Sequence, residues 1–206
     1  MSSSRQALRS FSPCSPSASW ARLSRKHCPG ATAEEPSMPA SAETLRRELA
    51  DAFRNRAHLY RLMLDVIGER HGPAEAEAIL MEVCERRGRE VAPLLFGGMQ
   101  PEPEAVARRF LSVSPDGGDL YPHDAEAAPG RFTIAVHACP LKQAWLDSGL
   151  AADTVATLCR IAGAFDKGLF EGAGLGFENS TWSEARGGGC CRITLRAPEG
   201  GKVPVA

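Results

Sequence analysis

The feature that most constrains this chain is the order of its apolar patterns, because helical spacing fills the first half and strand alternation appears only later. From Ser41 to Gly72, apolar residues recur every three or four positions, as on one face of a helix. The members of this stripe are Leu45, Leu49, Phe53, Tyr60, Leu64 and Ile67. Ser41 supplies an N-cap oxygen and Glu43 a first-turn negative charge. The pattern predicts an amphipathic helix of about 28 residues that stops near Gly72.

Two further helices are predicted before the midpoint of the chain. Pro73 suits the first turn of a second helix, which continues to about Gly88 or beyond. Its apolar stripe consists of Ala76, Ile79, Leu80 and Val83. Glycines at 97–98 interrupt the pattern, and residues 102–113 predict a third helix. Cys84 falls beside the second stripe, where we expect a buried structural thiol.

The second half indicates strands joined by turns and short helices. Residues 114–130 are rich in turn residues, and residues 132–138 then alternate in character as a strand does. Pro140 ends that strand and suits the start of a short helix, and residues 151–162 predict a further helix. Residues 177–195 predict a hairpin that turns at a run of glycines. The pattern defines an α+β class, with an N-terminal helical layer of two or three helices packed on a C-terminal antiparallel sheet with short helices.

Residues 1–40 lack helical or strand periodicity and are rich in Ser, Pro, Ala and Arg. The first 33 residues hold five basic residues and no acidic residue. Such a segment cannot bury enough apolar area to offset its ordering entropy. Three interpretations stay open: a disordered arm, a transit peptide, and a mis-assigned extension upstream of a true start at Met38. We expect residues 41–197 to form a single α+β domain and residues 198–206 a C-terminal tail.

Composition argues against several classes of protein. The longest uncharged apolar stretches fall far short of the roughly 18 residues that span a bilayer, so we expect no membrane partner. A formal net charge of −1 argues against nucleic-acid binding through a broad basic face. Seven cysteines without a secretory signal pattern indicate free thiols in a reducing compartment, and we expect a cytoplasmic protein. The expected partner is a small-molecule substrate, and the question of a homo-oligomer stays open.

Candidate reactive side chains gather in the last third of the chain. His137 and Cys139 are two positions apart, so on a strand both point to the same face. Cys159 and Asp166 are seven positions apart, or two helical turns, and share a face if the helix extends that far. Cys191 lies on the last predicted strand. Zinc accepts four of these residues (His137, Cys139, Cys159 and Cys191), but their spacing matches no zinc motif, so we expect no cofactor and leave zinc as an open alternative.

An ordered set of short motifs gives the chain a resemblance to a known family. The set comprises Cys139-Pro140-Leu141, Trp145, Gly149-Leu150, Leu158-Cys159, Phe165-Asp166, Gly172, Thr181 and the run from Gly189 to Ile193. Together with the preceding helices and Arg56-Ala57, it resembles the L-2-amino-thiazoline-4-carboxylic acid hydrolase family. The resemblance implies hydrolysis at a cyclic C=N/C–S bond of a small carboxylated heterocycle, with a carbamoyl-cysteine as the product.

This reaction needs a base for water, a proton donor for the leaving atom and a cation for the substrate carboxylate. Asp166 or His137 is a candidate base. Cys139 is a candidate nucleophile, because the start of a helix at Pro140 favours its thiolate. Cys159 and Cys191 complete the candidate catalytic set.

Two arginines, Arg186 and Arg192, flank the glycine turn and are candidates to hold the carboxylate through two hydrogen bonds. Thr181 joins the candidate substrate-binding residues through the resemblance. We expect the three candidate catalytic thiols to face one pocket and Cys84 to lie in the helical core. A different class of function stays open, which is a non-catalytic small-molecule or metal-binding sensor on the same fold.

Overall fold

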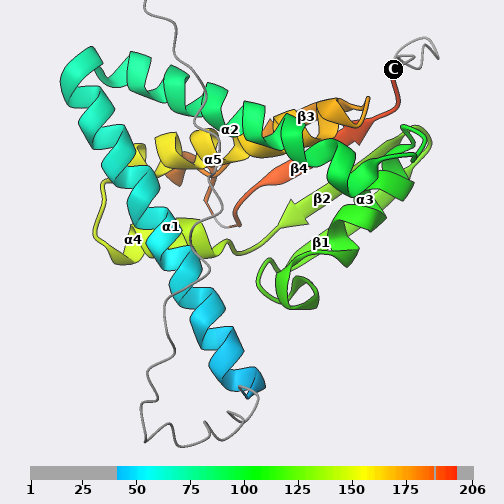
Figure 1. Ribbon diagram of the computed structural model, residues 1–206, viewed down its shortest axis with the longest axis horizontal. Helices are drawn as coiled ribbons and strands as arrows, with labels where there is room; N and C mark the ends of the chain where they lie inside the picture. The colour runs from blue at the N-terminus through cyan, green and yellow to red at the C-terminus, as the bar shows by residue number, and fades with distance from the viewer. Residues whose placement is uncertain (1–40, 188, 199–206) are drawn as a thin grey trace, which may run out of the picture. The chain divides into compact units, whose positions relative to one another are not determined.

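The computed structural model describes residues 41–187 and 189–198, and most of its helices precede its strands (Figure 1). The helices are α1 (Ala42–His71), α2 (Pro73–Phe96), α3 (Pro103–Ser112), α4 (Pro140–Asp147) and α5 (Ala152–Gly172), with 3-10 turns at Pro115–Gly118 and Glu184–Arg186. The strands are β1 (His123–Ala128), β2 (Arg131–Val136), β3 (Gly176–Ser180) and β4 (Arg192–Arg196). The predicted α+β class is confirmed. The expectations for residues 1–40 and for the tail beyond Pro198 lie outside the described residues.

Local signals set the ends of the first two helices, as predicted. The Ser41 side chain accepts a hydrogen bond from the Thr44 amide at 3.1 Å and so caps α1. Gly72 has a φ of 90°, a conformation that favours glycine, and it separates α1 from α2. Pro73 then occupies the first turn of α2. Within the described residues, no helix is both long and apolar enough to cross a membrane.

Helices α2 and α5 pack so closely that their backbones touch. A Cβ atom added at Gly88 would lie 2.1 Å from the carbonyl oxygen of Phe165 on α5. A Cβ atom added at Gly168 would lie 1.9 Å from the carbonyl oxygen of Glu85 on α2. No side chain fits at either distance, so both positions require glycine. Gly88 is therefore a packing position inside α2, which continues past it to Phe96.

The sheet has the strand order β1-β2-β4-β3, and every neighbouring pair is antiparallel. The predicted hairpin is formed by β3 and β4, but its connection spans residues 181–191 rather than the glycines alone. The prediction of turns throughout 114–130 is wrong for β1, which pairs with β2 at the edge of the sheet. Its sequence, His-Asp-Ala-Glu-Ala-Ala, lacks an apolar face because most of its side chains are exposed.

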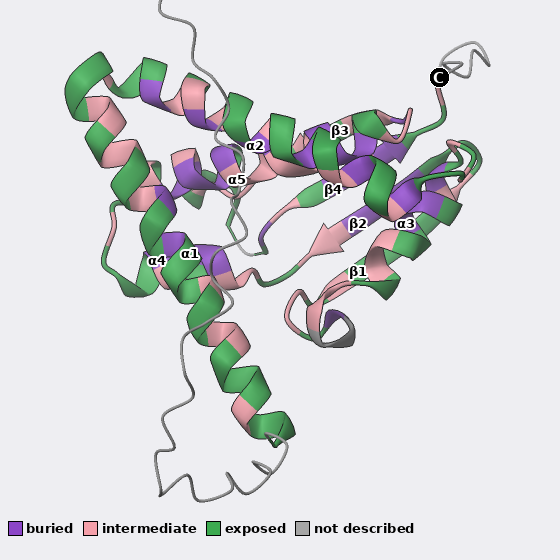
Figure 2. Cartoon of the chain, in the orientation of Figure 1, coloured by how far each residue is buried: buried purple, intermediate pink, exposed green. Residues whose placement is uncertain are grey.

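Buried positions, in purple, lie on helices and strands alike (Figure 2), and their apolar side chains form two clusters. The helical cluster consists of Ala57, Tyr60, Leu80, Cys84, Leu141, Trp145, Val155, Leu158, Cys159, Ile161 and Ala164. The sheet cluster consists of Ala92, Phe96, Val106, Ala107, Phe132, Ile134, Leu169, Phe170, Leu175, Ile193 and Leu195. Phe165 of α5 packs against both clusters. The expectation that Cys84 lies in the helical core is confirmed.

Candidate active site

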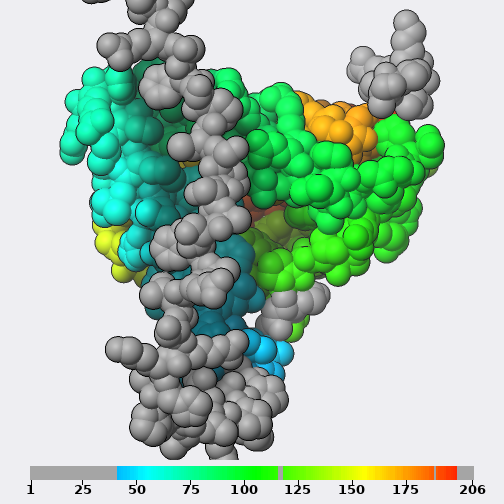
Figure 3. All heavy atoms as spheres, in the orientation of Figure 1, coloured from blue at the N-terminus to red at the C-terminus, as the bar shows by residue number. Residues whose placement is uncertain are grey.

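A cavity of about 320 Å³ is lined by side chains from both clusters. Its lining comes from α1, α2, α3, β2, α5 and the segments before β1, α4 and β4. The polar lining residues are Arg56, Ser114, Tyr121, His123, Cys139, Asp166, Cys190 and Cys191. In the space-filling view, the surface is hollowed between α1, in blue to cyan, and the green segment that contains α3 and β1 (Figure 3). Lining residues come from both sides of this hollow.

Cys139 is the N-cap residue of α4, and Pro140 occupies the first turn of that helix, as the sequence predicts. The pKa of the Cys139 thiol is lowered to about 7. The largest cause is the Cys190 thiol beside it, and the amides of Leu141 and Lys142 and the Lys142 charge act in the same direction against the effect of burial. These surroundings favour the thiolate form of Cys139 over that of an ordinary thiol.

Asp166 faces the same cavity from α5. Burial and, to a smaller extent, the negative charge of Cys139 together raise the pKa of its carboxyl group to about 7, against the opposing effect of the Arg56 charge. Asp166 has no hydrogen-bond partner among the described residues. A half-buried carboxyl group that accepts no hydrogen bond from the described residues and lines a cavity is available to exchange a proton with a ligand.

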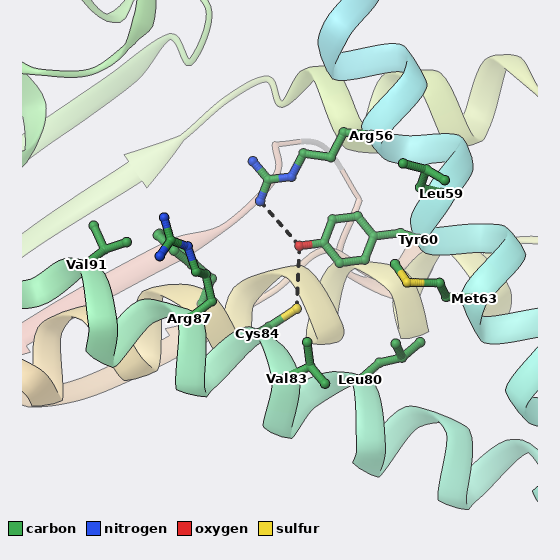
Figure 4. Close-up of a pocket in the computed structure, with 10 residues that line it drawn as sticks. Arg56, Leu59, Tyr60, Met63, Leu80, Val83, Cys84, Arg87 and Val91 are labelled. Carbon is green, nitrogen blue, oxygen red and sulfur yellow. Dashed lines mark hydrogen bonds between the residues drawn. The ribbon is translucent and has the colours of Figure 1, made fainter. Parts of the chain in front are cut away.

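Two further polar groups of the site come from distant parts of the chain. Burial raises the pKa of Tyr121, and the nearby charges of Cys139 and Asp166 add to this, so its hydroxyl stays protonated. Arg56 of α1 donates a hydrogen bond to the Tyr60 hydroxyl at 3.3 Å, and the same oxygen accepts one from Cys84 at 3.4 Å (Figure 4). Arg56 forms no ion pair with any described residue.

His137 does not belong to this site. Strand β2 ends at Val136, so the prediction that His137 and Cys139 share a strand face is wrong. His137 is exposed, and its Nε2 atom lies 3.0 Å from the carboxylate of Asp124 on β1. It does not line the cavity, which leaves Asp166 as the candidate base.

The expectation that three thiols face one pocket holds for Cys139 and Cys191 but not for Cys159. Cys159 is buried in the helical cluster, and burial raises its pKa to about 12, with smaller contributions from Cys191 and Cys139. Cys190 takes its place in the cavity, with its sulfur 3.6 Å from that of Cys191. The neighbouring thiols of Cys139 and Cys191, and then burial, raise the pKa of Cys190, which therefore stays protonated.

The predicted substrate-binding residues also lie outside the cavity lining. Arg192 begins β4 and points away from the face of its neighbour Ile193, because side chains alternate along a strand. Arg186 is exposed and donates a hydrogen bond to the carbonyl oxygen of Thr181 at 3.0 Å. Thr181 packs beside Gly163, which does line the cavity. The cation that faces the cavity is Arg56 instead.

Sequence reasoning thus missed five polar residues of the cavity lining: Arg56, Ser114, Tyr121, His123 and Cys190. A signal was available for Arg56, since the pair Arg56-Ala57 is part of the family resemblance. Tyr121 lies in a turn-rich segment with no periodicity, so nothing in the sequence marks it. Among the described residues, no group of three or more His, Cys, Asp or Glu side chains is arranged to hold a metal ion.

The fold and the cavity together define an α+β protein with an enclosed thiol–carboxyl site, an arrangement suited to nucleophilic and acid–base hydrolysis. The model of the L-2-amino-thiazoline-4-carboxylic acid hydrolase family matches residues 52–195. The chain therefore belongs to this family, which makes it hydrolase-like. The matched range includes Arg56, Tyr121, Cys139 and Asp166. Neither the curated proteins nor the solved structures contain a match to the chain.

Proposed function

We propose that the chain opens the ring of a small carboxylated cyclic amidine by hydrolysis, with Cys139 as the nucleophile and Asp166 as the acid and base. The observation that carries the proposal is that both side chains line one cavity, where the negative charge of Cys139 helps to raise the pKa of Asp166. Each has a pKa of about 7, so one proton can be held by either group at neutral pH.

In the first step, the Cys139 thiolate adds to the carbon between the ring sulfur and the two nitrogens. The Tyr121 hydroxyl can donate a hydrogen bond to the ring nitrogen as negative charge develops there. The carbon–sulfur bond of the ring then breaks. Protonated Asp166 gives its proton to the departing sulfur, which leaves the substrate carbon bound to Cys139 as an isothiourea.

In the second step, Asp166 acts as a carboxylate and takes a proton from water while the water oxygen adds to the same carbon. The intermediate collapses to the carbonyl product with loss of the Cys139 thiolate, as the remaining proton of the added water moves to the former ring nitrogen. The product is a carbamoyl-cysteine with a free thiol, and the sum of both steps is the addition of one water molecule to the ring compound. Asp166 keeps the proton taken from water, which restores the starting state.

Arg56 is the group that can hold the substrate carboxylate. Its guanidinium reaches the cavity, lacks an ion-pair partner among the described residues and is oriented by the Tyr60 hydroxyl. An arginine in this state can bind a carboxylate through two hydrogen bonds. Arg56 therefore takes the role that the sequence suggested for the hairpin arginines.

The proposal is tested with 2-aminothiazoline-4-carboxylate, whose opening releases a thiol that can be measured with a thiol reagent. Cys139→Ser should lower kcat to the level of the uncatalysed reaction while the circular dichroism spectrum stays unchanged. Cys159→Ala, which removes a thiol outside the cavity, is the matched control and should retain turnover. Full activity of Cys139→Ser would contradict the proposal. Tight binding without turnover in the unmodified chain would instead support a sensor.

The pH profile is a second test of the same mechanism. The first step needs the thiolate of Cys139 and the protonated form of Asp166, and both groups have a pKa of about 7. We expect a bell-shaped profile of kcat/KM with its maximum near pH 7 and a fall on both sides. A profile that rises steadily up to about pH 9 would show that protonated Asp166 is not required.

A further inference from the structure

The cavity has two chemically different ends. The polar end contains Cys139, Asp166, Tyr121 and Arg56, whose charges act on one another. The other end belongs to the sheet cluster, where α2, α3, α5 and β2 meet. Its lining side chains are Val91, Leu95, Phe110, Leu111, Ile134 and Leu169. Every one of these is apolar.

The direction of α5 and β2 separates the two ends. Leu169 follows Asp166 by three residues, or about 4.5 Å along a helix axis. Ile134 precedes the end of β2 by two residues, or about 7 Å along a strand, and so lies away from Cys139. Both Leu169 and Ile134 belong to the sheet cluster. The apolar end therefore extends away from the reacting groups on two independent elements.

The space is larger than the proposed reaction needs. A 2-aminothiazoline-4-carboxylate is about the size of one free amino acid. The cavity has a volume of 320 Å³, which lies within the range of roughly 300–1,000 Å³ that proteins use for drug-sized ligands. Water gains few hydrogen bonds from an apolar lining, so an apolar group is the favoured occupant of the remaining space.

We propose that the ligand of this cavity is a carboxylated molecule with an alkyl or aryl substituent, whose polar head faces Arg56 and Cys139 and whose apolar part fills the end near Leu111. The assignment of the head rests on the proposed function. The assignment of the apolar part rests on the sheet cluster alone. The substrate class is thereby extended from a small heterocycle to a heterocycle that carries an apolar group.

Binding of butanoate, hexanoate and octanoate, measured by calorimetry, tests the two-ended site without any need for turnover. Burial of each additional methylene should increase the affinity about fourfold. Leu111→Trp fills the apolar end, so it should abolish the increase in affinity from butanoate to octanoate. Leu94→Trp is the matched control, because Leu94 is 79% exposed on α2 and lies outside the cavity lining.

Val113→Trp is a second variant in case Leu111→Trp does not fold, since Val113 lines the cavity and is 43% exposed. An affinity that does not depend on chain length would overturn the inference. The inference would also be overturned if the affinity still increased with chain length in a folded Leu111→Trp or Val113→Trp variant. Arg56→Gln should weaken all three carboxylates by the same factor, and a loss confined to one of them would overturn the placement of the head.

A comparison of ring opening separates this inference from the proposed function. We expect 5-butyl-2-aminothiazoline-4-carboxylate to have a higher kcat/KM than the unsubstituted compound. Opening of the unsubstituted compound without any gain from the butyl group or from chain length would overturn the two-ended site and leave the proposed function intact. Chain-length-dependent binding with no opening of either ring would overturn the proposed function and leave the two-ended site intact.

Discussion

The strongest quantitative prediction concerns the Asp166→Asn variant. Its stability relative to the unmodified protein should increase from acidic to neutral pH. Asp166 has an ordinary pKa of 3.8, and its surroundings raise this value to about 7 in the folded state. At a pH between these two pKa values, Asp166 binds more protons in the folded state than in the unfolded state. The stability of the unmodified protein therefore falls as pH rises through this window and no further above it.

The size of the effect follows from the shift. Each unit of pKa difference corresponds to about 1.4 kcal/mol, so a rise from about pH 5 to about pH 7.5 should remove roughly 2–3 kcal/mol from the unmodified protein through this group. Asparagine does not ionise and fills nearly the same volume. The Asp166→Asn variant should therefore lack this loss, and its advantage over the unmodified protein should grow by the same amount.

Urea unfolding of both proteins at the two pH values measures this difference, and the comparison cancels groups that titrate equally in both. Asp153→Asn is the matched control on the same helix, because Asp153 is exposed in the first turn of α5. Its effect on stability should not change with pH over this range. A stability difference between Asp166→Asn and the unmodified protein that stays constant from acidic to neutral pH would refute the reasoning.

Three further predictions follow from the same structure. At about pH 7, iodoacetamide should modify Cys139 about tenfold faster than an unperturbed thiol and leave Cys159 unmodified until unfolding, as measured by peptide mass spectrometry. Gly88→Ala should lower the free energy of unfolding by about 3 kcal/mol in urea titrations, because its methyl group would overlap a carbonyl oxygen of α5. Trp145→Phe should cost about 1–3 kcal/mol in the same assay, because it removes the 2.8 Å hydrogen bond to the buried Ala57 carbonyl.

Local features of the chain were enough to predict most of the helices. The stripe of α1, the Ser41 cap and the Gly72-Pro73 junction all depend on residues within about four positions of one another. The start of α4 directly after Cys139 has the same local origin. The pKa of the Cys139 thiol is lowered, which is the direction expected from the sequence. Strand β1 escaped prediction because an exposed edge strand needs no apolar alternation.

The sequence by itself therefore determined the class of fold and the family, and it pointed to Cys139 as the candidate nucleophile. Only the tertiary structure decided which groups surround that thiol. Arg56 and Asp166 are 110 positions apart, and they share a cavity because α1 and α5 both pack into the helical cluster. His137 is only two positions from Cys139 and yet lies outside the cavity, because β2 ends at Val136 and the two residues lie in the connection between β2 and α4. Periodicity and capping act over a few residues, whereas the composition of a cavity depends on how distant elements pack.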